Sequence, residues 1–226
     1  QVGELIADLM KRGRNPTVGT SAADLIISIR INANGESSEL ACRLADADVA
    51  EIRSRLGISV FGEGEQTIQG AVADLLRAKK LTVSTAESCT GGLIAKRLTD
   101  ISGSSEYFVQ GFVTYANESK SRLLVVPAEL ITTHGAVSAE VARAMAENCR
   151  RIAATDCALS ATGIAGPTGG SPDKPVGLVY VGLASKKDVV VKELRLGEVL
   201  SREQIRDRAG KIALNLLRLE LLGHSG

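Results

Sequence analysis

The hydrophobic and polar positions of the chain follow two patterns. Apolar side chains spaced three or four residues apart are typical of helices that bury one face. Short runs rich in valine and isoleucine are typical of strands. These patterns predict helices over residues 5–12, 40–56, 68–76, 90–100, 117–125, 138–153 and 201–221, and strands over residues 25–31, 58–61, 82–86, 107–115, 157–161, 177–184 and 189–195.

The order of these elements predicts two domains. The stretch 62–65 is glycine-rich and charged, which is typical of an exposed connector. Residues 1–62 before it predict a small α+β domain. Residues 66–226 alternate strands with helices, which predicts an α/β fold, a three-layer α/β/α sandwich. Because the last strands follow one another closely, we expect a mixed sheet with antiparallel pairs on one side.

The composition argues against a nucleic-acid-binding protein, a membrane protein and a protein with a histidine-rich metal site. The 226 residues carry 27 basic and 26 acidic side chains, a net charge of +1, so we expect no broad positive surface for nucleic acid or an anionic membrane. No apolar run reaches the roughly 18 residues of a membrane span. Four scattered cysteines without a C-x-x-C pair predict a cytoplasmic protein, and two histidines are too few for a histidine-rich metal site. The chain begins at Gln1, and we expect that a segment upstream has been removed.

Four segments of residues 66–226 are dense in glycine and in side chains that can carry chemistry. Each falls at the end of a strand or between two elements, where α/β folds hold their ligands. The segments are 86–92, 103–105, 115–120 and 161–170.

The segment 86–92 has three interpretations. Ser88 or Thr90 can cap the helix that follows. The free N–H groups of the loop, around Thr90 and Gly91, can instead bind an oxyanion or a phosphate. Cys89 can be a nucleophile assisted by Glu87, or a small buried apolar residue.

The segment 161–170 holds a loose glycine pattern. Gly163, Gly166 and Gly169 are spaced as G-x-x-G-x-x-G, but no helix begins there, so the dinucleotide-binding fingerprint is not matched. A P-loop is excluded because no Gly-Lys-Ser/Thr follows the glycines at 91–92. The segment is either a surface turn or a cradle for a substrate phosphate.

Tyr115 and Lys120 are five residues apart across a strand-to-helix corner. A lysine in a cleft can lose its proton and act as a general base toward a serine hydroxyl. Lowering its pKa from ~10.4 to ~7 takes about 4 kcal/mol of burial and neighbouring charge. Tyr115 would relay the proton or orient the amine; alternatively Lys120 is solvated and Tyr115 faces the core. A Ser-His-Asp triad with His134 as its base is the competing interpretation, although Thr133-His134-Gly135 looks like a turn that ends a helix.

Together these segments resemble the C-terminal domain of the CinA competence/damage-inducible protein family, whose stand-alone members are called PncC. The resemblance covers about residues 66–226 and rests on motifs that occur in the family's order. They are the segment 86–92, Gly-Phe-Val-Thr-Tyr at 111–115, His-Gly-Ala-Val-Ser at 134–138, Gly-Ile-Ala-Gly-Pro at 163–167 and Lys-Pro-Val-Gly at 174–177. The first sixty residues look like the small KH-type domain of full-length members, which also carry a molybdopterin-binding-like N-terminal domain that this sequence does not contain.

The resemblance implies nicotinamide-nucleotide amidohydrolase activity, in which nicotinamide mononucleotide and water give nicotinic acid mononucleotide and ammonia. It implies no metal ion or organic cofactor, and we expect a homodimer that binds a small nucleotide. The motifs imply that Ser105 is the nucleophile and that Lys120 and Tyr115 activate it. The substrate-binding positions are Thr90, Gly91, Thr162, Gly163 and Arg202, with Arg206 as the alternative to Arg202.

A binding module without amidase activity is the alternative class of function. In that case the KH-like domain would recruit nucleic acid. Residues 1–64 hold 7 Lys/Arg against 9 Asp/Glu and lack the basic G-x-x-G loop with which KH domains clamp a nucleic-acid backbone. Both observations argue against nucleic acid as a partner.

Overall fold

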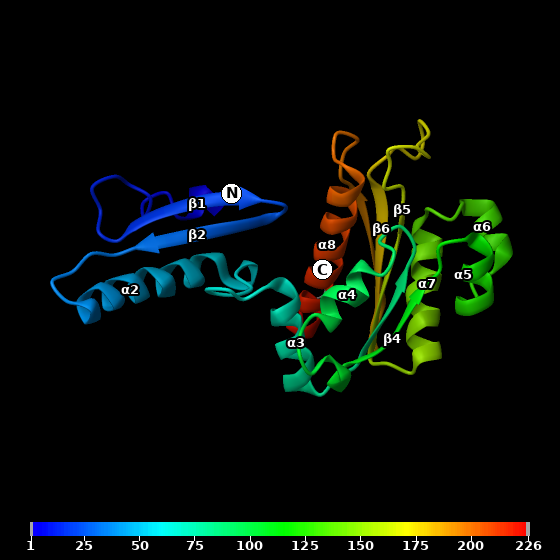
Figure 1. The fold of residues 1–226 in the computed structure, drawn as a ribbon, viewed down its shortest axis with the longest axis horizontal. Coiled ribbons are helices and arrows are strands. Elements are labelled where there is room, and N and C mark those ends of the chain that lie inside the picture. Colours follow the sequence, from blue (N-terminus) through cyan, green and yellow to red (C-terminus); the bar gives the residue numbers. More distant parts are fainter. Residues whose placement is uncertain (1, 225–226) are drawn as a thin grey trace. The chain divides into compact units, whose positions relative to one another are not determined.

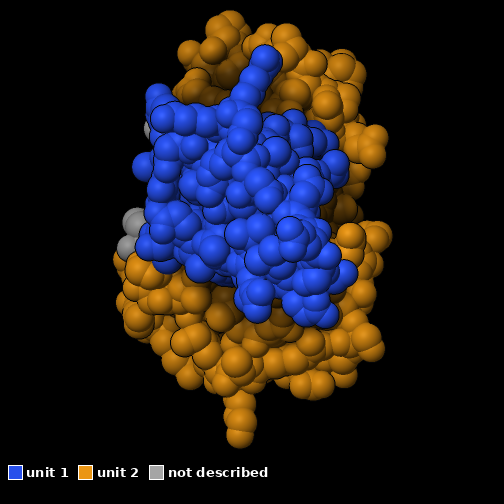
Figure 2. All heavy atoms as spheres, turned by 90° about the vertical axis from the view of Figure 1, so that its left-hand side faces the viewer, with its two compact units in different colours: residues 1–62 blue, residues 63–226 orange. Residues whose placement is uncertain are grey.

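The computed structural model describes residues 2–224. The chain divides into two compact units, unit 1 (Gln1–Gly62) and unit 2 (Glu63–Gly226), which Figure 2 shows in separate colours. Each unit has its own cluster of buried apolar side chains, which is the property that defines a domain.

Unit 1 is an antiparallel hairpin with a long helix. Strands β1 (Thr17–Ala23) and β2 (Ile26–Asn32) pair antiparallel, and α2 (Ser38–Leu56) follows them. The short helix α1 (Val2–Leu5) opens the unit and the 3-10 turn η1 (Gly57–Ser59) follows α2. Its buried core consists of Ile6, Leu9, Val18 and Ile52.

Unit 1 differs from the sequence prediction in three places. The helix expected up to residue 12 ends at Leu5, and turns follow it. The pattern does not predict β1, because its residues are small or polar and all but one of them are exposed. The strand expected over 58–61 is wrong: these residues have no pairing partner and begin in the turn η1.

Unit 2 is built on a five-stranded sheet with the strand order β4-β3-β5-β6-β7. Strands β3 (Val83–Glu87), β4 (Phe108–Val113) and β5 (Cys157–Gly163) run parallel to one another. Strands β6 (Leu178–Ala184) and β7 (Val189–Arg195) extend the sheet antiparallel. The predicted mixed sheet is therefore confirmed.

Helices cover both faces of this sheet, as Figure 1 shows. One face carries α3 (Ile68–Lys79), α4 (Leu93–Thr99) and α8 (Arg202–Leu221). The other carries α5 (Asn117–Leu124), α6 (Ala128–His134) and α7 (Ala139–Ala153). The predicted three-layer sandwich is confirmed. Helix α6 is not among the predicted helices, although it ends at His134, where the sequence predicted a turn that ends a helix.

The inner strand β3 is buried on both faces along its whole length. Alternate residues of a strand point to opposite faces. Ser84 accepts a hydrogen bond from Cys149 of α7, whereas Glu87 accepts hydrogen bonds from the backbone of α4. The carboxyl ends of β3, β4 and β5 meet at one edge of the sheet, which we call the carboxyl edge. Four loops and the start of α8 converge there.

Candidate functional site

Three hydroxyl side chains lie in a row at the carboxyl edge. The residue pairing of the parallel strands places Glu87 beside Val113 of β4 and beside Ala161 of β5. The pairing continues for one more residue, because Ser88 N donates to Ala161 O and Thr114 N donates to Glu87 O, both at 2.8 Å. Thr114, Ser88 and Thr162 are therefore neighbours on adjacent strands, which are about 4.8 Å apart.

Lys120 of α5 covers this row. Its side chain is 1 % exposed, and its Nζ lies 3.1 Å from Ser88 Oγ, 3.0 Å from Thr114 O and 3.3 Å from Tyr115 O. Burial lowers the pKa of Lys120 below its ordinary value. The prediction that Lys120 lies in the site rather than in solvent agrees with this geometry.

These three contacts satisfy both protonation states of the amine. A neutral amine has two N–H donors and one lone pair, so it donates to the carbonyls of Thr114 and Tyr115 and accepts the Ser88 proton. A protonated amine has three donors and gives one to each oxygen. Lys120 can therefore take a proton from Ser88 and return it without moving.

The structure places Ser105 elsewhere. Ser105 lies in the exposed 3-10 turn η2 (Ser104–Glu106), directly before β4, whereas Lys120 comes after that strand. The six residues of β4 span roughly 20 Å. The expected contact between Ser105 and Lys120 is therefore wrong within one chain. A whole strand separates the two residues, and the hydroxyl beside Lys120 belongs to Ser88.

The segment 86–92 is held by a buried carboxylate. Glu87 is fully buried, and its two oxygens accept the backbone N–H groups of Ile94 and Ala95 at 3.0 and 2.8 Å. Helix α4 begins after Gly92 with no side-chain bond from its capping residue, so the predicted cap by Ser88 or Thr90 is wrong. Glu87 fixes the turn that presents Ser88.

Cys89 is not an activated thiol. It is 6 % exposed, and burial raises its pKa to about 12, so it stays protonated at neutral pH. Both observations argue against Cys89 as the nucleophile. A second residue of this turn, Thr90, is fully buried, and its hydroxyl has no hydrogen-bond partner among residues 2–224. The hydroxyl of Thr114 shares this property.

Both candidate arginines of α8 lie at the carboxyl edge. Arg202 donates to Tyr115 Oη at 2.7 Å and to Gly166 O at 2.9 Å. Arg206, one helical turn later, donates to Thr90 O at 2.8 Å and lies against Gly91. The hydroxyl of Tyr115 thus faces Arg202, while only its backbone carbonyl contacts Lys120, which argues against a proton relay through Tyr115.

The loop after β5 closes the site from the side of β6. Thr162 Oγ1 donates to Ala136 O at 2.7 Å. Gly163 has no room for a side chain, since a Cβ would lie 2.7 Å from Leu178 O. Lys174 Nζ fastens the loop to the carbonyls of His134 and Val137 at 2.6 and 2.7 Å.

His134 has a structural place. It is the last residue of α6, and its Nδ1 lies 3.5 Å from Glu140. No contact joins it to Ser88 among the described residues, so the structure offers no His-based triad.

Comparison with known proteins decides the family. The model of the CinA C-terminal domain matches residues 65–221, and the model of the damage-inducible protein CinA KH domain matches residues 1–62. The chain belongs to the CinA family.

Two curated relatives show the extent of the likeness. A CinA-like protein of Geobacter sulfurreducens is 51% identical over 198 residues, 87% of this chain and 47% of the relative. A CinA-like protein of Dictyoglomus thermophilum is 46% identical over 219 residues, 97% of this chain and 53% of the relative. The chain thus spans about half the length of these CinA relatives.

Solved CinA structures share the fold of unit 2. The competence/damage inducible protein of Agrobacterium tumefaciens is 40% identical with a TM-score of 0.65, covering 71% of this chain and 99% of that one. A CinA superfamily protein of Klebsiella pneumoniae is 29% identical with a TM-score of 0.66, covering 69% and 96%. Every residue of the row and of its surroundings falls inside the matched CinA C-terminal domain.

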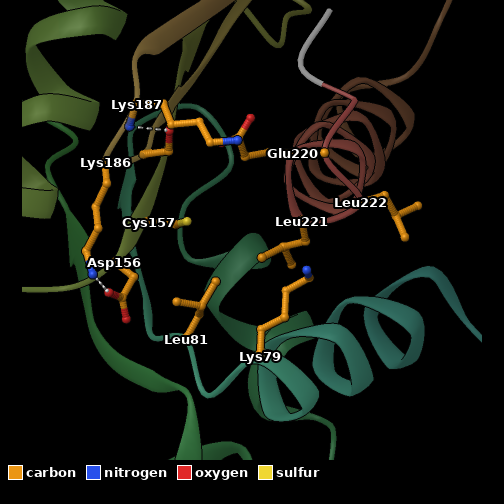
Figure 3. Close-up of a pocket in the computed structure, with 11 residues that line it drawn as sticks. Lys79, Leu81, Asp156, Cys157, Lys186, Lys187, Glu220, Leu221 and Leu222 are labelled. Carbon is orange, nitrogen blue, oxygen red and sulfur yellow. Dashed lines mark hydrogen bonds and ion pairs between the residues drawn. The ribbon is translucent and has the colours of Figure 1, made fainter.

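A separate cavity lies at the opposite end of the CinA domain (Figure 3). Its volume is about 300 Å³, and its lining includes Lys79, Leu81, Cys157 and Glu220. Two of the charged residues that line it, Lys186 and Asp156, form an ion pair of 2.7 Å with each other. The cavity contains none of the hydroxyl groups described above, so we place the candidate site at the carboxyl edge.

The described part of the chain also bears on membranes and metal ions. None of its helices combines the length and apolar character that crossing a membrane requires. No group of three or more His, Cys, Asp or Glu side chains within it could hold a metal ion.

Proposed function

We propose that this chain is an amidohydrolase in which Ser88 is the nucleophile and Lys120 its general base. The observation that supports it is the 3.1 Å contact between a buried amine and a hydroxyl at the carboxyl edge of an α/β sheet. Ser88 is 9 % exposed and Lys120 is 1 % exposed, so a substrate reaches the hydroxyl first and the amine lies behind it. The substrate, nicotinamide mononucleotide, follows from the resemblance to the CinA family.

The first half of the reaction acylates Ser88. Lys120 accepts the hydroxyl proton as Ser88 Oγ bonds to the carboxamide carbon, which gives a tetrahedral oxyanion. The backbone N–H group of Gly92 has no backbone acceptor among residues 2–224, whereas those of Cys89 and Thr90 face the Cys89 sulfur, and the turn that carries all three adjoins the nucleophile. One such donor is worth about 10²–10³ in rate when it meets the oxyanion.

The second half releases the acid. Protonated Lys120 gives its proton to the departing nitrogen, the C–N bond breaks, and ammonia leaves an acyl ester on Ser88. Water then attacks this ester while Lys120 again accepts a proton. The bond between the acyl carbon and Ser88 Oγ breaks, Lys120 returns the proton to Ser88 Oγ, and nicotinic acid mononucleotide leaves as the acid and loses its own proton to solvent. Lys120 is neutral at the start and at the end of the cycle, the state that its burial favours by lowering its pKa.

Tyr115 and Arg206 can bind the nicotinamide ring and the 5′-phosphate of a mononucleotide. The ring of Tyr115 is 59 % exposed and offers a flat surface to the nicotinamide ring. Arg206 uses two of its five N–H donors on Thr90 O, which leaves a fork of donors for the 5′-phosphate. Arg202 supports Tyr115 from the same helix.

Release of ammonia from nicotinamide mononucleotide by the purified chain tests the proposal. Ser88→Ala should lower kcat/KM by about 10³-fold or more. Ser119→Ala is the matched control, because Ser119 lies on the same helix as Lys120 but bonds only to Ala116 O. The function is overturned if the wild type releases no ammonia. The nucleophile is overturned if Ser88→Ala keeps full activity.

A further inference from the structure

We propose that the cavity at the start of β5 is a binding site for a small monoanion, a carboxylate that carries an aromatic or branched apolar body. Cys157, the first residue of β5, lines this cavity, whereas the other end of the strand lies at the carboxyl edge. The proposal therefore concerns a second site in unit 2, and it does not rest on the proposed function.

Four parts of unit 2 enclose the cavity. Its lining comes from the end of α3, the start of β5, the turn between β6 and β7 and the end of α8. Its volume of about 300 Å³ lies at the lower end of the range of small-molecule pockets. The cavity therefore suits a ligand of the size of a single ring with its substituents.

Hydrogen bonds and an ion pair hold the walls in place. Ser185 N donates to Asp188 O at 2.9 Å, which closes the turn between β6 and β7. Lys186 lies 2.7 Å from Asp156, so this turn is tied to the start of β5. Asp156 also accepts hydrogen bonds from the backbone N and the Oγ1 of Thr82, both at 2.9 Å. A ligand therefore meets a preformed site, and little ordering free energy is lost on binding.

The floor of the cavity is apolar. Figure 3 shows the side chains of Leu81, Cys157 and Leu221 pointing into the hollow. Cys157 and Leu221 are each 4 % exposed. Burial raises the pKa of Cys157 to about 11, so its thiol is neutral and acts as a small apolar group. A ligand gains free energy in proportion to the apolar area that it removes from water here.

The charged side chains give the lining a net positive charge. Three lysines, Lys79, Lys186 and Lys187, stand against two acids, Asp156 and Glu220, which leaves +1. Lys186 is paired with Asp156, whereas Lys79 and Lys187 form no ion pair within residues 2–224. One negative charge on a ligand balances this lining, so a carboxylate fits it better than a doubly charged phosphate.

Lys79 has no part in closing the helix that carries it. A lysine in the last turn of a helix often donates to the last carbonyls. In α3 the carbonyls of Leu76 and Arg77 already accept the backbone N–H of Lys80, and that of Leu76 also accepts the N–H of Leu81. The backbone thus caps the helix without the Lys79 ammonium, which is left to meet a ligand at the cavity.

Benzoate tests the site, because it combines one carboxylate with one apolar ring. In amide NMR spectra of the full chain, benzoate should shift the signals of Leu81, Cys157 and Gly223 with a Kd of about 1 mM, as expected for a ligand of about nine non-hydrogen atoms. Benzamide has the same shape without the charge, and acetate has the charge without the ring. Each should bind about fivefold more weakly or worse.

A matched pair of lysine variants tests the recognition of the charge. Lys79→Gln should weaken benzoate binding about fivefold. Lys80→Gln is the control, because Lys80 is the next residue, is exposed and does not line the cavity. Both positions are exposed, so both variants should fold like the wild type.

Three results would overturn the site. The first is the absence of a saturable shift at the cavity, including a shift confined to Gly163 at the carboxyl edge. The second is equal binding of benzamide or of the cation benzylamine, and the third is an equal Kd for Lys79→Gln and Lys80→Gln. Ammonia release enters none of these measurements, so a failure of the proposed function leaves this test intact.

Discussion

Lys120 Nζ and Ser88 Oγ lie 3.1 Å apart, although Lys120 belongs to helix α5 and Ser88 follows strand β3, 32 positions earlier in the sequence. The contact exists because β3 and β4 are parallel neighbours, so the residues that follow them meet at one edge. The amine is enclosed there, and the hydrogen-bond partners that the structure gives it within residues 2–224 are all oxygens. This relationship determines what each change below should do.

Replacing Lys120 by methionine should abolish activity and stabilise the fold. Methionine fills the space of the buried stem without an amine that must be desolvated, so we expect a gain of about 1–2 kcal/mol in the free energy of unfolding. Denaturant titration of both proteins at neutral pH measures it. A destabilised Lys120→Met chain would contradict the view that burial of the amine costs stability.

The same residue should make stability depend on pH. Because the pKa of Lys120 is lowered from 10.5 in the folded chain, the folded state binds fewer protons than the unfolded state between the lowered pKa and 10.5. The wild type therefore gains stability as the pH rises through this window. The difference from Lys120→Met should shrink toward pH 10.5, which melting curves across that range can follow.

Activity should rise with pH through the lowered pKa of Lys120. The base must be neutral to accept the Ser88 proton, so kcat/KM should climb and then level off below pH 10.5. A pH profile of ammonia release locates the midpoint. A profile that rises only above pH 10.5 would mean that the amine is not the base.

Glu87→Gln should loosen the turn that presents Ser88. A glutamine side chain offers one carbonyl oxygen where two backbone N–H groups of α4 need acceptors, and its amide would face one of them. We expect a loss of about 1–3 kcal/mol in the unfolding free energy together with lower activity. Glu106→Gln is the control, because the Glu106 side chain is 66 % exposed.

Alkylation should distinguish the cysteines. Cys42 is exposed, whereas Cys89 is buried with a pKa of about 12, so iodoacetamide should label the former and spare the latter in the folded chain. Peptide mass spectrometry reads the sites. Cys89→Ala should keep most of the activity, and its loss would restore a thiol to the mechanism.

Arg206→Ala should raise KM for nicotinamide mononucleotide about tenfold or more and hardly change KM for nicotinamide riboside, which lacks the phosphate. Arg202→Ala should affect both substrates alike, since Arg202 holds Tyr115. Steady-state kinetics with the two substrates separates the roles. Equal effects of Arg206→Ala on both would remove the phosphate contact.

The sequence predicts the layers of unit 2 because its strands and long helices bury continuous apolar faces. It misses α6, which is short, and β1, which is almost wholly exposed. The pairing of Ser105 with Lys120 was wrong for one chain because it came from the resemblance, whereas the predicted strand 107–115 already separates the two residues. The signal for Ser88 was nevertheless present: it directly follows a predicted strand whose parallel neighbour leads to Lys120.

Ser88, the proposed nucleophile, directly follows the inner strand β3 rather than lying on a long loop. A serine side chain has a single rotatable bond to its oxygen, and its backbone here is anchored by Ala161 on one side, while Thr114 continues the ladder on the other. Little conformational entropy remains to be lost when a substrate arrives. The position of the Ser88 hydroxyl is therefore set by the register of the strands. A shift of one residue in the pairing of β3 with either neighbour would move the hydroxyl away from Lys120, although every residue of the site would still be present in the sequence.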